Sequence, residues 1–368
     1  MRRVIIISDF TYPNYVGGSA KLVYDTLVGF SKNNIDYLLI TRTSSNEYSV
    51  KEHNDFYLSE KKRNKIFEIN NLLDIIRSYK FIKNDDILYI HHPVLGVFYS
   101  FLKNKKIYFF HGPFPEEYRL KPNSNSLGLF LRYLIQKIVL KKNNKIFVLS
   151  NYMKEWVNKY GGKNIEIVPP IFDYEKFASF SAVDKFELRR QLNLPVDKKI
   201  LITTRRLTDR TGVLELLEAF EYINLHYKND YFLIIIGKGE LEAKVKQKCS
   251  NIKNARFLGY VQEDLLPKYL RASDVYILPS KSLEGFGIVI LEAMALNIPV
   301  IASNKSGGAT EFLSTIDAKL IFDFDNMARS LNESIKYLES VNIDFSSIAR
   351  SYDRNVVAKI IYEKMNEC

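Results

Sequence analysis

The sequence predicts an α/β protein built from two doubly wound parallel-sheet domains. Apolar runs of strand length alternate with helix-length segments along the chain, and this alternation breaks once, near residues 169–183, before it resumes. Continuous apolar strands separated by helices are typical of a parallel sheet covered on both faces. The length of 368 residues also exceeds the usual size of one hydrophobic core. We therefore expect two similar domains joined by a linker.

Each half of the chain contains five apolar runs that we predict to be strands. In the first half, a loop with Gly17 and Gly18 follows the first run and leads into a helix near residues 19–33. In the second half, helices are predicted at residues 212–227 and 241–250, and a last helix at 346–365. The predicted strands are residues 4–8, 37–41, 87–91, 106–110 and 145–149, then 199–203, 231–236, 255–258, 275–278 and 299–302.

Composition restricts the class of protein and its compartment. Cys249 and Cys368 are the two cysteines, and their separation gives neither a disulfide framework nor metal-ligand spacing, which favours a reducing compartment. The apolar run after Met1 is too short for a signal peptide and predicts a buried first strand. Residues 127–140 are interrupted by charged and polar side chains, so no stretch is predicted to span a membrane.

Positive charge is concentrated in the first half. The net charge is +11, of which residues 1–180 carry +10. One basic cluster lies at residues 61–65, and a second contains Arg132, Lys137, Lys141, Lys142 and Lys145. Anionic lipid head groups attract such clusters; a solvated surface is the alternative. Nucleic acid is not expected as a partner, because zinc-finger spacing and RNA-binding fingerprints are absent from the sequence.

The segment from Glu284 to Glu292 is the strongest functional signal. Residues 288–296 predict a helix that is apolar on every face and therefore buried, where a glutamate is rare unless it is paired. Gly285 and Gly287 precede this helix, and free N–H groups at a helix N-terminus favour an anion. The segment thus combines an anion site with two acceptors for hydroxyl groups. The alternative is a core helix whose glutamate pairs with an arginine.

Basic residues follow the first predicted strand of the second half. Arg205, Arg206 and Arg210 precede Gly212, and guanidinium groups at a strand end suit a diphosphate. The alternative is a surface cluster neutralised by Asp209 and Glu215. Ligands of doubly wound sheets bind outside the carboxyl ends of the strands, which makes this position a candidate binding site.

Other strand ends give weaker signals. His111 ends a strand beside a glycine and is a site candidate. His91 and His92 are adjacent on a strand and point to opposite faces, so we expect that they do not share a ligand and that one of them packs. The Asp323–Asp325 pair lies in a polar loop, so we predict no metal site there.

Taken together, these motifs resemble the retaining glycosyltransferases of family 4, which have the GT-B fold. The resemblance covers nearly the whole chain and centres on Glu284 and Glu292, with seven residues between them. The supporting segments are Gly17-Gly18, His111-Gly112, residues 148–150, 257–260 and 272–280, and Gly307-Gly308 followed by Glu311. The resemblance implies two Rossmann-like domains facing a central cleft, at residues 1–178 and 185–345, with a helix at 346–368 crossing back to the first domain.

The resemblance also implies roles for individual residues. Arg206 and Arg210 would bind the donor diphosphate; the family usually has a lysine where this chain has Thr211. Glu284 and the backbone of Phe286, Gly287 and Ile288 would hold the donor sugar and phosphate, and Glu292 would accept from the ribose. The remaining implied contacts are Gly259 and Tyr260 at the base, His111 near the sugar, and Gly17 and Gly18 near the phosphates and acceptor. Residues 170–173 depart from the family pattern, which leaves the role of that loop unassigned.

The expected reaction follows from this resemblance. A sugar moves with retention from a nucleotide diphosphate, with a UDP-sugar favoured over a GDP-sugar, to a lipid-linked saccharide or a surface-glycan precursor. No metal and no further cofactor are expected. The enzyme would be cytoplasmic and bind peripherally to the inner face of the membrane through its basic first half.

Three other classes remain open. One is a sugar-nucleotide epimerase or phosphorylase on the same fold. A second is a nicotinamide dehydrogenase, which the absence of Gly-x-Gly-x-x-Gly after the first strand disfavours. A third is a non-catalytic nucleotide- or glycan-binding paralogue, which Thr211 leaves possible.

Overall fold

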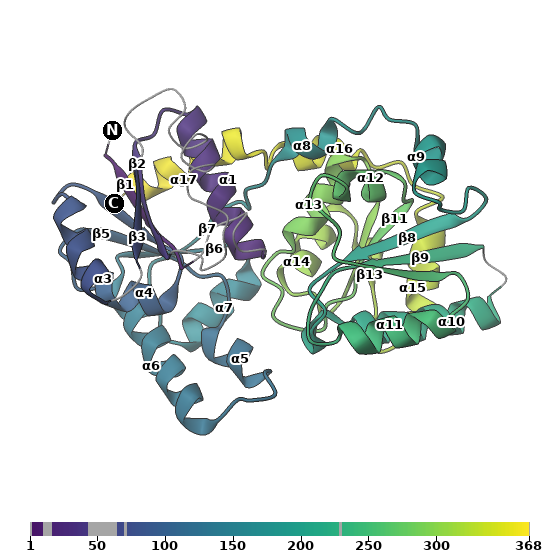
Figure 1. Ribbon diagram of the computed structural model, residues 1–368, viewed down its shortest axis with the longest axis horizontal. Coiled ribbons are helices and arrows are strands. Elements are labelled where there is room, and N and C mark those ends of the chain that lie inside the picture. The colour runs from purple at the N-terminus through teal and green to yellow at the C-terminus, as the bar shows by residue number, and fades with distance from the viewer. Residues whose placement is uncertain (1, 10–16, 43–64, 70–71, 228–229, 368) are drawn as a thin grey trace. The chain divides into compact units, whose positions relative to one another are not determined.

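The computed structural model of this protein describes residues 2–9, 17–42, 65–69, 72–227 and 230–367, and its chain divides into two compact units. Unit 1 comprises residues 1–172 and 352–368, and unit 2 comprises residues 173–351. Each unit contains one parallel sheet flanked by helices (Figure 1). This architecture confirms the predicted α/β fold class.

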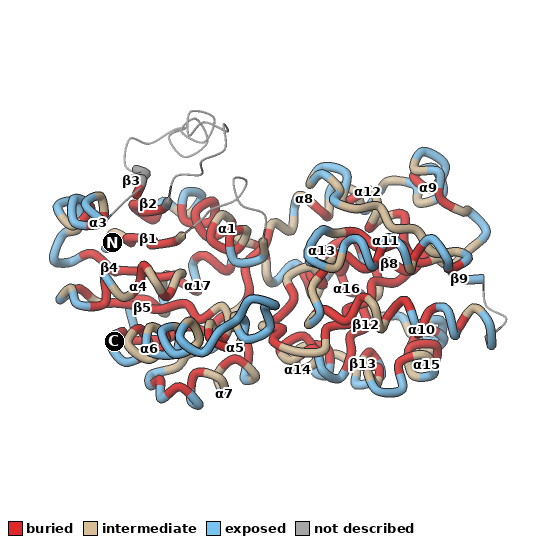
Figure 2. The backbone as a smooth tube through the Cα atoms, turned by 60° about the horizontal axis from the view of Figure 1, so that its bottom comes forward, coloured by how far each residue is buried: buried red, intermediate tan, exposed pale blue. Residues whose placement is uncertain are grey.

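Unit 1 is built on a seven-stranded sheet in the order β3-β2-β1-β4-β5-β6-β7. The first strand is continuously apolar, and its residues Val4, Ile5, Ile6 and Ile7 are fully buried because helices cover both faces. Figure 2 shows the same burial along the central strands of both units. The strands are β1 (Val4–Ile7), β2 (Tyr37–Arg42), β3 (Lys65–Ile69), β4 (Ile87–Ile90), β5 (Lys105–Phe109), β6 (Lys145–Val148) and β7 (Ile165–Ile167).

The helices of unit 1 include the last helix of the chain. They are α1 (Gly18–Lys32), α3 (Leu72–Ser78), α4 (Pro93–Tyr99), α5 (Phe114–Arg119), α6 (Ser126–Lys142), α7 (Asn151–Lys159) and α17 (Arg354–Asn366). No helix within the described part of the chain is long and apolar enough to cross a membrane. The basic cluster at residues 61–65 lies outside the described residues, apart from the backbone of Lys65 in β3.

Unit 2 repeats the topology of unit 1 with a six-stranded sheet in the order β10-β9-β8-β11-β12-β13. The strand order therefore reverses between β1 and β4 in unit 1, and between β8 and β11 in unit 2. The strands are β8 (Lys199–Thr204), β9 (Tyr231–Ile236), β10 (Ala255–Gly259), β11 (Val275–Leu278), β12 (Val300–Ser303) and β13 (Ile321–Phe322). The helices are α8 (Tyr174–Ala178), α9 (Lys185–Gln191), α10 (Val213–His226), α11 (Glu242–Asn251), α12 (Leu266–Arg271), α13 (Ile288–Ala295), α14 (Gly308–Ile316), α15 (Met327–Tyr337) and α16 (Phe345–Arg350).

The C-terminal segment differs from the single helix predicted at 346–365. It forms two helices, α16 in unit 2 and α17 in unit 1, because Asp353 caps a new helix by accepting a hydrogen bond from the backbone N–H of Asn355 at 2.9 Å. The unit boundaries accordingly fall at 172/173 and 351/352 rather than at 178 and 346. Both α8 and α16 pack against α13, which places them with unit 2.

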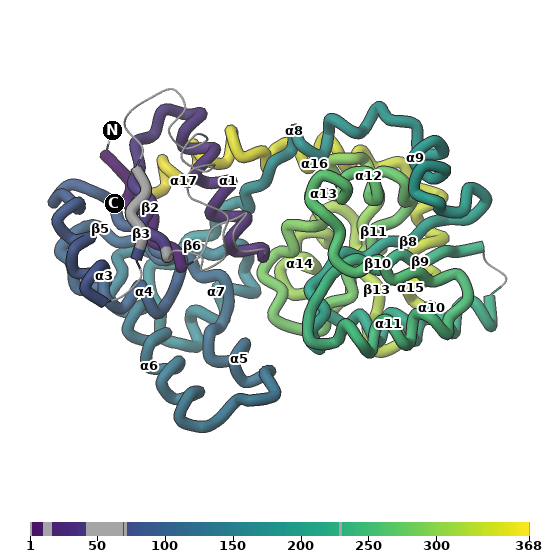
Figure 3. Tube along the Cα trace, in the orientation of Figure 1, coloured from purple at the N-terminus to yellow at the C-terminus, as the bar shows by residue number. Residues whose placement is uncertain are grey.

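The last helix returns to the first one, as the GT-B resemblance implied. Helix α17, yellow in Figure 3, lies beside α1, which is purple. The approach is so close that a Cβ on Gly29 would lie 2.5 Å from the carbonyl oxygen of Arg354 and 2.6 Å from the Cβ of Ala358. The guanidinium of Arg354 also pairs with the buried carboxylate of Asp25 at 3.1 Å. These contacts attach α17 to unit 1.

Candidate functional site

The candidate site of unit 2 lies at the switch point of its sheet, where β8 and β11 end next to each other. Arg205 follows β8, and Ser280 and Glu284 follow β11. The Arg205 guanidinium donates to the hydroxyl of Ser280 at 2.9 Å and forms an ion pair with the carboxylate of Glu284. Ser280 in turn donates to Glu284 at 3.1 Å. Side chains separated by about 80 residues in sequence thus form one polar cluster where this fold places ligands.

Glu284 is buried and ionised within this cluster. Burial by itself would raise its pKa, but the positive charges of Arg205 and Arg210, with the hydrogen bonds from Arg205 and Ser280, hold the pKa below its usual value. An ionised carboxylate accepts hydrogen bonds and does not donate them. Glu284 is therefore suited to binding hydroxyl groups. The alternative of a core-helix glutamate paired with an arginine concerned Glu292, whereas the arginine pair is found at Glu284, which precedes the helix.

The predicted diphosphate-binding arginines lie on the loop that follows Arg205. Arg206 is exposed, and Arg210 is half-buried with its guanidinium donating to the carbonyl oxygen of Leu283 at 3.3 Å. Arg210 therefore reaches the residue directly before Glu284. Arg210 and Glu284, both predicted as site residues, lie close together in the structure, and Arg205, to which the resemblance gave no role, is the residue that pairs with Glu284.

The two acids that could have neutralised this arginine cluster have another partner. Lys281 pairs with Asp209 and with Glu215, each at 2.8 Å. These pairs occupy the acids and overturn the alternative in which Asp209 and Glu215 neutralise the arginines. The cluster at the end of β8 therefore keeps a positive excess.

Thr211 has a structural position in this loop. Its side chain is buried, and its hydroxyl contacts the carbonyl oxygens of Arg206 at 2.9 Å and Thr208 at 2.7 Å. The next residue, Gly212, has a φ of 68°, and a Cβ there would lie 1.9 Å from the carbonyl oxygen of Pro279. The loop is thus packed tightly against the end of β11, with Thr211 facing inward and Arg210 closer to the surface.

The helix that carries Glu292 begins beside Glu284. Gly287 caps α13 with a φ of 79°, a conformation that favours glycine, and Phe286 is buried before it. Glu292 is buried on α13, and its charge acts on the phenol of Tyr276 in β11. The backbone N–H of Gly308 donates to the carbonyl oxygen of Glu284 at 3.0 Å, which joins the Gly307-Gly308 motif to the same loop. Phe286, Gly287, Ile288 and Glu292 therefore adjoin the cluster.

Gly259 and Tyr260 lie at the same carboxyl edge but at the outer strand. The carbonyl oxygen of Gly259 accepts from the backbone N–H of Gly237 at 2.8 Å, and the ring of Tyr260 is 46% exposed. The ammonium of Lys238 lies 4.8 Å from the centre of that ring. An exposed aromatic face with a neighbouring cation is a surface on which a nucleotide base can stack.

Unit 1 presents histidines at its own switch point. The Nδ1 of His91 and the Nε2 of His111 lie 3.0 Å apart, so one nitrogen donates to the other and the accepting ring is neutral. Burial lowers the pKa of His111 to about 3 and the pKa of His91 well below its usual value. His91 stacks on the ring of Phe109, whereas His92 turns to Asp9, with 3.6 Å between Nε2 and Oδ2. The prediction that the two adjacent histidines do not share a ligand is consistent with this arrangement.

The glycine pair of unit 1 opens α1. Gly17 is the N-cap residue with an extended φ of 176°, and a Cβ on Gly18 would meet no atom within 4 Å. Among the described residues, the space beside Gly18 is therefore open. Their predicted contact with phosphate stays a prediction, because residues 10–16 before them lie outside the described residues.

Within the described residues, no group of three or more histidine, cysteine, aspartate or glutamate side chains could hold a metal ion. The Asp323–Asp325 loop forms protein contacts instead: Asp323 accepts from Asn304 at 2.9 Å, and Asp325 pairs with Lys305 at 2.5 Å.

Two family models match the chain. Residues 16–176 match the family described as Glycosyltransferase Family 4, and residues 184–354 match the family described as Glycosyl transferases group 1. The two matches cover both units in the order that the GT-B fold requires. The chain belongs to this family of glycosyltransferases.

Several curated proteins that are similar to this chain are named as glycosyltransferases. The GDP-mannose-dependent monoacylated alpha-(1-6)-phosphatidylinositol monomannoside mannosyltransferase of Corynebacterium glutamicum is 26% identical over 212 residues, which are 55% of this chain and 55% of that protein. The GDP-mannose-dependent alpha-(1-6)-phosphatidylinositol monomannoside mannosyltransferase of Mycobacterium tuberculosis is 31% identical over 186 residues, 48% of each chain. The chain spans about half the length of the curated relatives it matches.

Solved structures share the whole fold. Anabaena Alr3699/HepE in complex with UDP matches with a TM-score of 0.76 over 100% of both chains at 16% identity. Sucrose-phosphate synthase from Thermosynechococcus elongatus matches with a TM-score of 0.74 over 99% of this chain and 98% of that one, also at 16% identity. At this identity the likeness establishes the fold.

Proposed function

We propose that this protein is a retaining, metal-independent glycosyltransferase that uses a nucleotide-diphosphate sugar. The observation that carries the proposal is the cluster at the switch point of unit 2, where an ionised Glu284 lies beside Arg205 and Arg210. Such a cluster offers an acceptor for sugar hydroxyls next to cations for a diphosphate. The acceptor substrate is a lipid-linked saccharide or a surface-glycan precursor, in keeping with the names of the curated relatives.

Each site residue has a role in this proposal. Arg206 and Arg210 bind the diphosphate and stabilise the charge that grows on it as the glycosidic bond breaks, which is commonly the largest contribution to catalysis. Glu284 accepts hydrogen bonds from the sugar, and the backbone of Phe286, Gly287 and Ile288 binds sugar and phosphate. Glu292 accepts from the ribose, Gly259 and Tyr260 contact the base, and Gly17 and Gly18 contact phosphate or acceptor.

The stereochemistry follows from the carboxylates that the site offers. Glu284 is held by Arg205 and Ser280, so it is a poor nucleophile for a covalent intermediate. The proposed reaction is therefore attack on the face from which the diphosphate departs, with the leaving phosphate accepting the proton of the acceptor hydroxyl. His111 contributes a neutral imidazole to sugar binding in this scheme.

Thr211 no longer favours a non-catalytic paralogue. Its buried hydroxyl maintains the loop, and Arg210 supplies the cation that the family usually takes from a lysine at the position of Thr211. An epimerase or phosphorylase on the same fold stays the alternative. Product analysis with and without an acceptor distinguishes it, because an epimerase needs no acceptor.

A panel of nucleotides tests the donor. We expect UDP to raise the unfolding temperature more than GDP or ADP, since stabilisation follows affinity for the folded state. GDP-mannose is the competing donor, given the names of the relatives.

We also expect Glu292→Ala to reduce turnover sharply and EDTA to leave it unchanged. Near-normal transfer by Glu292→Ala, or activity that EDTA removes and a divalent ion restores, would contradict the assigned roles.

The place of action is the inner face of the cytoplasmic membrane, with the protein cytoplasmic and peripherally bound. The charge of the first half supports this proposal, because anionic head groups attract basic segments. Salt-sensitive binding to vesicles of anionic lipid is the expected result, and its absence would remove the membrane proposal without affecting the donor proposal.

A further inference from the structure

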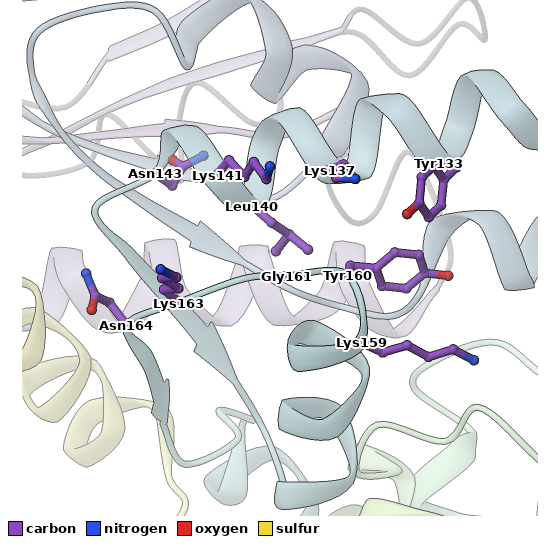
Figure 4. Close-up of a pocket in the computed structure, with 10 residues that line it drawn as sticks. All are labelled: Tyr133, Lys137, Leu140, Lys141, Asn143, Lys159, Tyr160, Gly161, Lys163 and Asn164. Atoms are coloured by element: carbon purple, nitrogen blue, oxygen red, sulfur yellow. The ribbon is translucent and has the colours of Figure 1, made fainter.

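Unit 1 contains a cavity of about 700 Å³ between the C-terminal ends of α6 and α7. Figure 4 shows Tyr133 and Tyr160 at one end of the cavity and Asn143 and Asn164 at the other. Ten residues line it: Tyr133, Lys137, Leu140, Lys141, Asn143, Lys159, Tyr160, Gly161, Lys163 and Asn164.

This cavity is separate from the histidine site of unit 1. Asn143 and Asn164 precede β6 and β7, so they mark the amino edge of the parallel sheet. His91 and His111 follow β4 and β5 and therefore mark the opposite, carboxyl edge. The cavity thus lies away from the edge where this fold places its substrates, and the proposed glycosyl transfer does not use it.

The lining is strongly positive. It contains four lysines and no acidic residue. Within the described structure, no carboxylate lies within ion-pair distance of Lys137, Lys141, Lys159 or Lys163. The nearby Glu116 pairs with Arg119 at 2.9 Å and accepts from the hydroxyl of Tyr160 at 3.3 Å. The C-termini of α6 and α7 contribute only about half a negative charge each, so the cavity keeps a positive excess.

Polar and aromatic side chains lie at the two ends of the cavity. Asn143 is buried, its amide nitrogen donates to the carbonyl oxygen of Val139 at 2.6 Å, and its Oδ1 has no hydrogen-bond partner among the described residues. The Oδ1 atom is itself buried, so it is not an accessible acceptor for a ligand in the cavity. The rings of Tyr133 and Tyr160, 5.8 Å apart, close one end.

The same helix carries exposed apolar side chains next to the cavity. Leu127, Phe130, Leu131 and Leu134 are 69%, 57%, 48% and 39% exposed, and their spacing places them on one face of α6. Lys137 and Lys141 follow Leu134 by three and seven residues and continue this face. An apolar helix face that ends in lysines is typical of a segment that lies at a lipid head-group boundary.

We infer that this cavity is a second binding site, which takes the phosphate group of a phosphate ester. The phosphate lies among the four lysines. The apolar face of α6 makes a phospholipid head group the favoured source, and a soluble sugar or glycerol phosphate presents the same chemistry. This inference does not depend on the glycosyltransferase proposal, since binding is measured without a donor.

The test compares two charge-matched double variants. Lys141→Gln with Lys163→Gln removes two exposed lysines of the cavity, and Lys244→Gln with Lys246→Gln removes two exposed lysines of α11 in unit 2. Binding is measured by sedimentation with vesicles of phosphatidylcholine and phosphatidylglycerol, and by calorimetry with glycerol 3-phosphate. We expect the cavity variant to bind roughly 25-fold more weakly, about fivefold for each lysine, and the control variant to bind as the wild type does.

The two measurements distinguish the source of the phosphate. Selective loss of vesicle binding identifies a phospholipid, and selective loss of glycerol 3-phosphate binding identifies a soluble ligand; either result supports the site. Equal losses in the two double variants would show that only net charge matters and would overturn the inference. Unchanged binding by the cavity variant, with its unfolding transition intact, would overturn it as well.

Discussion

The carboxyl edges of the two sheets have the same topology but differ in electrostatic character. In unit 2, the switch point holds charged side chains in contact, with Arg205 paired to an ionised Glu284. In unit 1, it holds two imidazoles that burial keeps neutral and that hydrogen-bond to each other. The shared strand order therefore fixes where side chains gather, whereas the residues after each strand decide whether the site carries charge. A charged site suits a diphosphate, and a neutral one suits hydroxyl groups.

The largest expected effect tests the charged side of this comparison. Arg205→Ala leaves the carboxylate of Glu284 buried without its ion pair, so we expect unit 2 to lose about 3–5 kcal/mol of unfolding free energy. Urea unfolding monitored in unit 2 measures it. Adding Glu284→Gln to Arg205→Ala should restore part of the loss, because the buried charge is then gone.

A matched control for this experiment is Arg329→Ala. Arg329 pairs with Glu333 on the exposed surface of α15 at 2.9 Å, so its removal should leave the transition close to that of the wild type. Equal losses from the two substitutions would show that the burial of the Arg205 pair has no special importance.

The next effect concerns the affinity of unit 2 for a diphosphate. Arg206→Ala and Arg210→Ala should each weaken UDP binding by about 10- to 100-fold, because a hydrogen bond to a charged group contributes about 1.5–3 kcal/mol. Calorimetric titration with UDP measures the change. Arg350→Ala, on the exposed surface of α16, is the control and should bind as the wild type does. Unchanged affinity in both site variants would place the diphosphate elsewhere.

The neutral side of the comparison has a pH signature. The unfolded chain protonates its imidazoles near pH 6.5, whereas the folded chain keeps His111 neutral down to a pKa of about 3. The unfolded state therefore binds more protons below pH 6.5, and unit 1 should lose at most about 1.4 kcal/mol per pH unit for each imidazole as the pH falls.

Unfolding of unit 1 at several pH values checks this slope. His111→Asn removes one titrating group and should make the slope between pH 6 and pH 4 shallower by about one proton. A variant with the slope of the wild type would show that His111 is protonated in the folded protein as readily as in the unfolded chain.

The smallest expected effect concerns the loop that carries the arginines. Thr211→Val keeps the shape of the side chain but removes the hydroxyl that contacts the carbonyl oxygens of Arg206 and Thr208, so unit 2 should lose about 1 kcal/mol. Thr315→Val is the control, because its hydroxyl donates to a carbonyl at the exposed end of α14. Equal transitions for the two variants would remove the structural role of Thr211.

The sequence predicted those parts of the fold that depend on local pattern. Strands β1, β8 and β9 lie in the core and are largely apolar, and their positions were predicted to within one or two residues. Strands β3, β7 and β13 were not predicted; β7 and β13 have three and two residues, too few to show any periodicity. The break between α16 and α17 was also missed, because the sequence pattern stays helical while the two helices pack in different units.

The candidate site was predicted less completely, for a geometric reason. Arg205 and Arg206 are neighbours, and consecutive residues of an extended chain point to opposite sides. Which of them turns inward depends on Ser280 and Glu284, which are 75 and 79 residues away in sequence. The contact of His91 with His111 also joins different strands. Residue type predicted the chemistry here, and tertiary packing decided which residue takes part in it.

The chain passes from unit 1 to unit 2 after residue 172 and returns to unit 1 after residue 351. This path gives the two units an order of assembly during translation. Phe172 and Asp353 form a bridge within unit 1, and the backbone N–H of Arg354 donates to the carbonyl oxygen of Phe172 at 2.8 Å. Unit 2 is therefore an insertion into unit 1, and all its residues leave the ribosome before α17 does. Until then the surface of α1 around Gly29 has no cover, so the half that is synthesised first is the last to close its core.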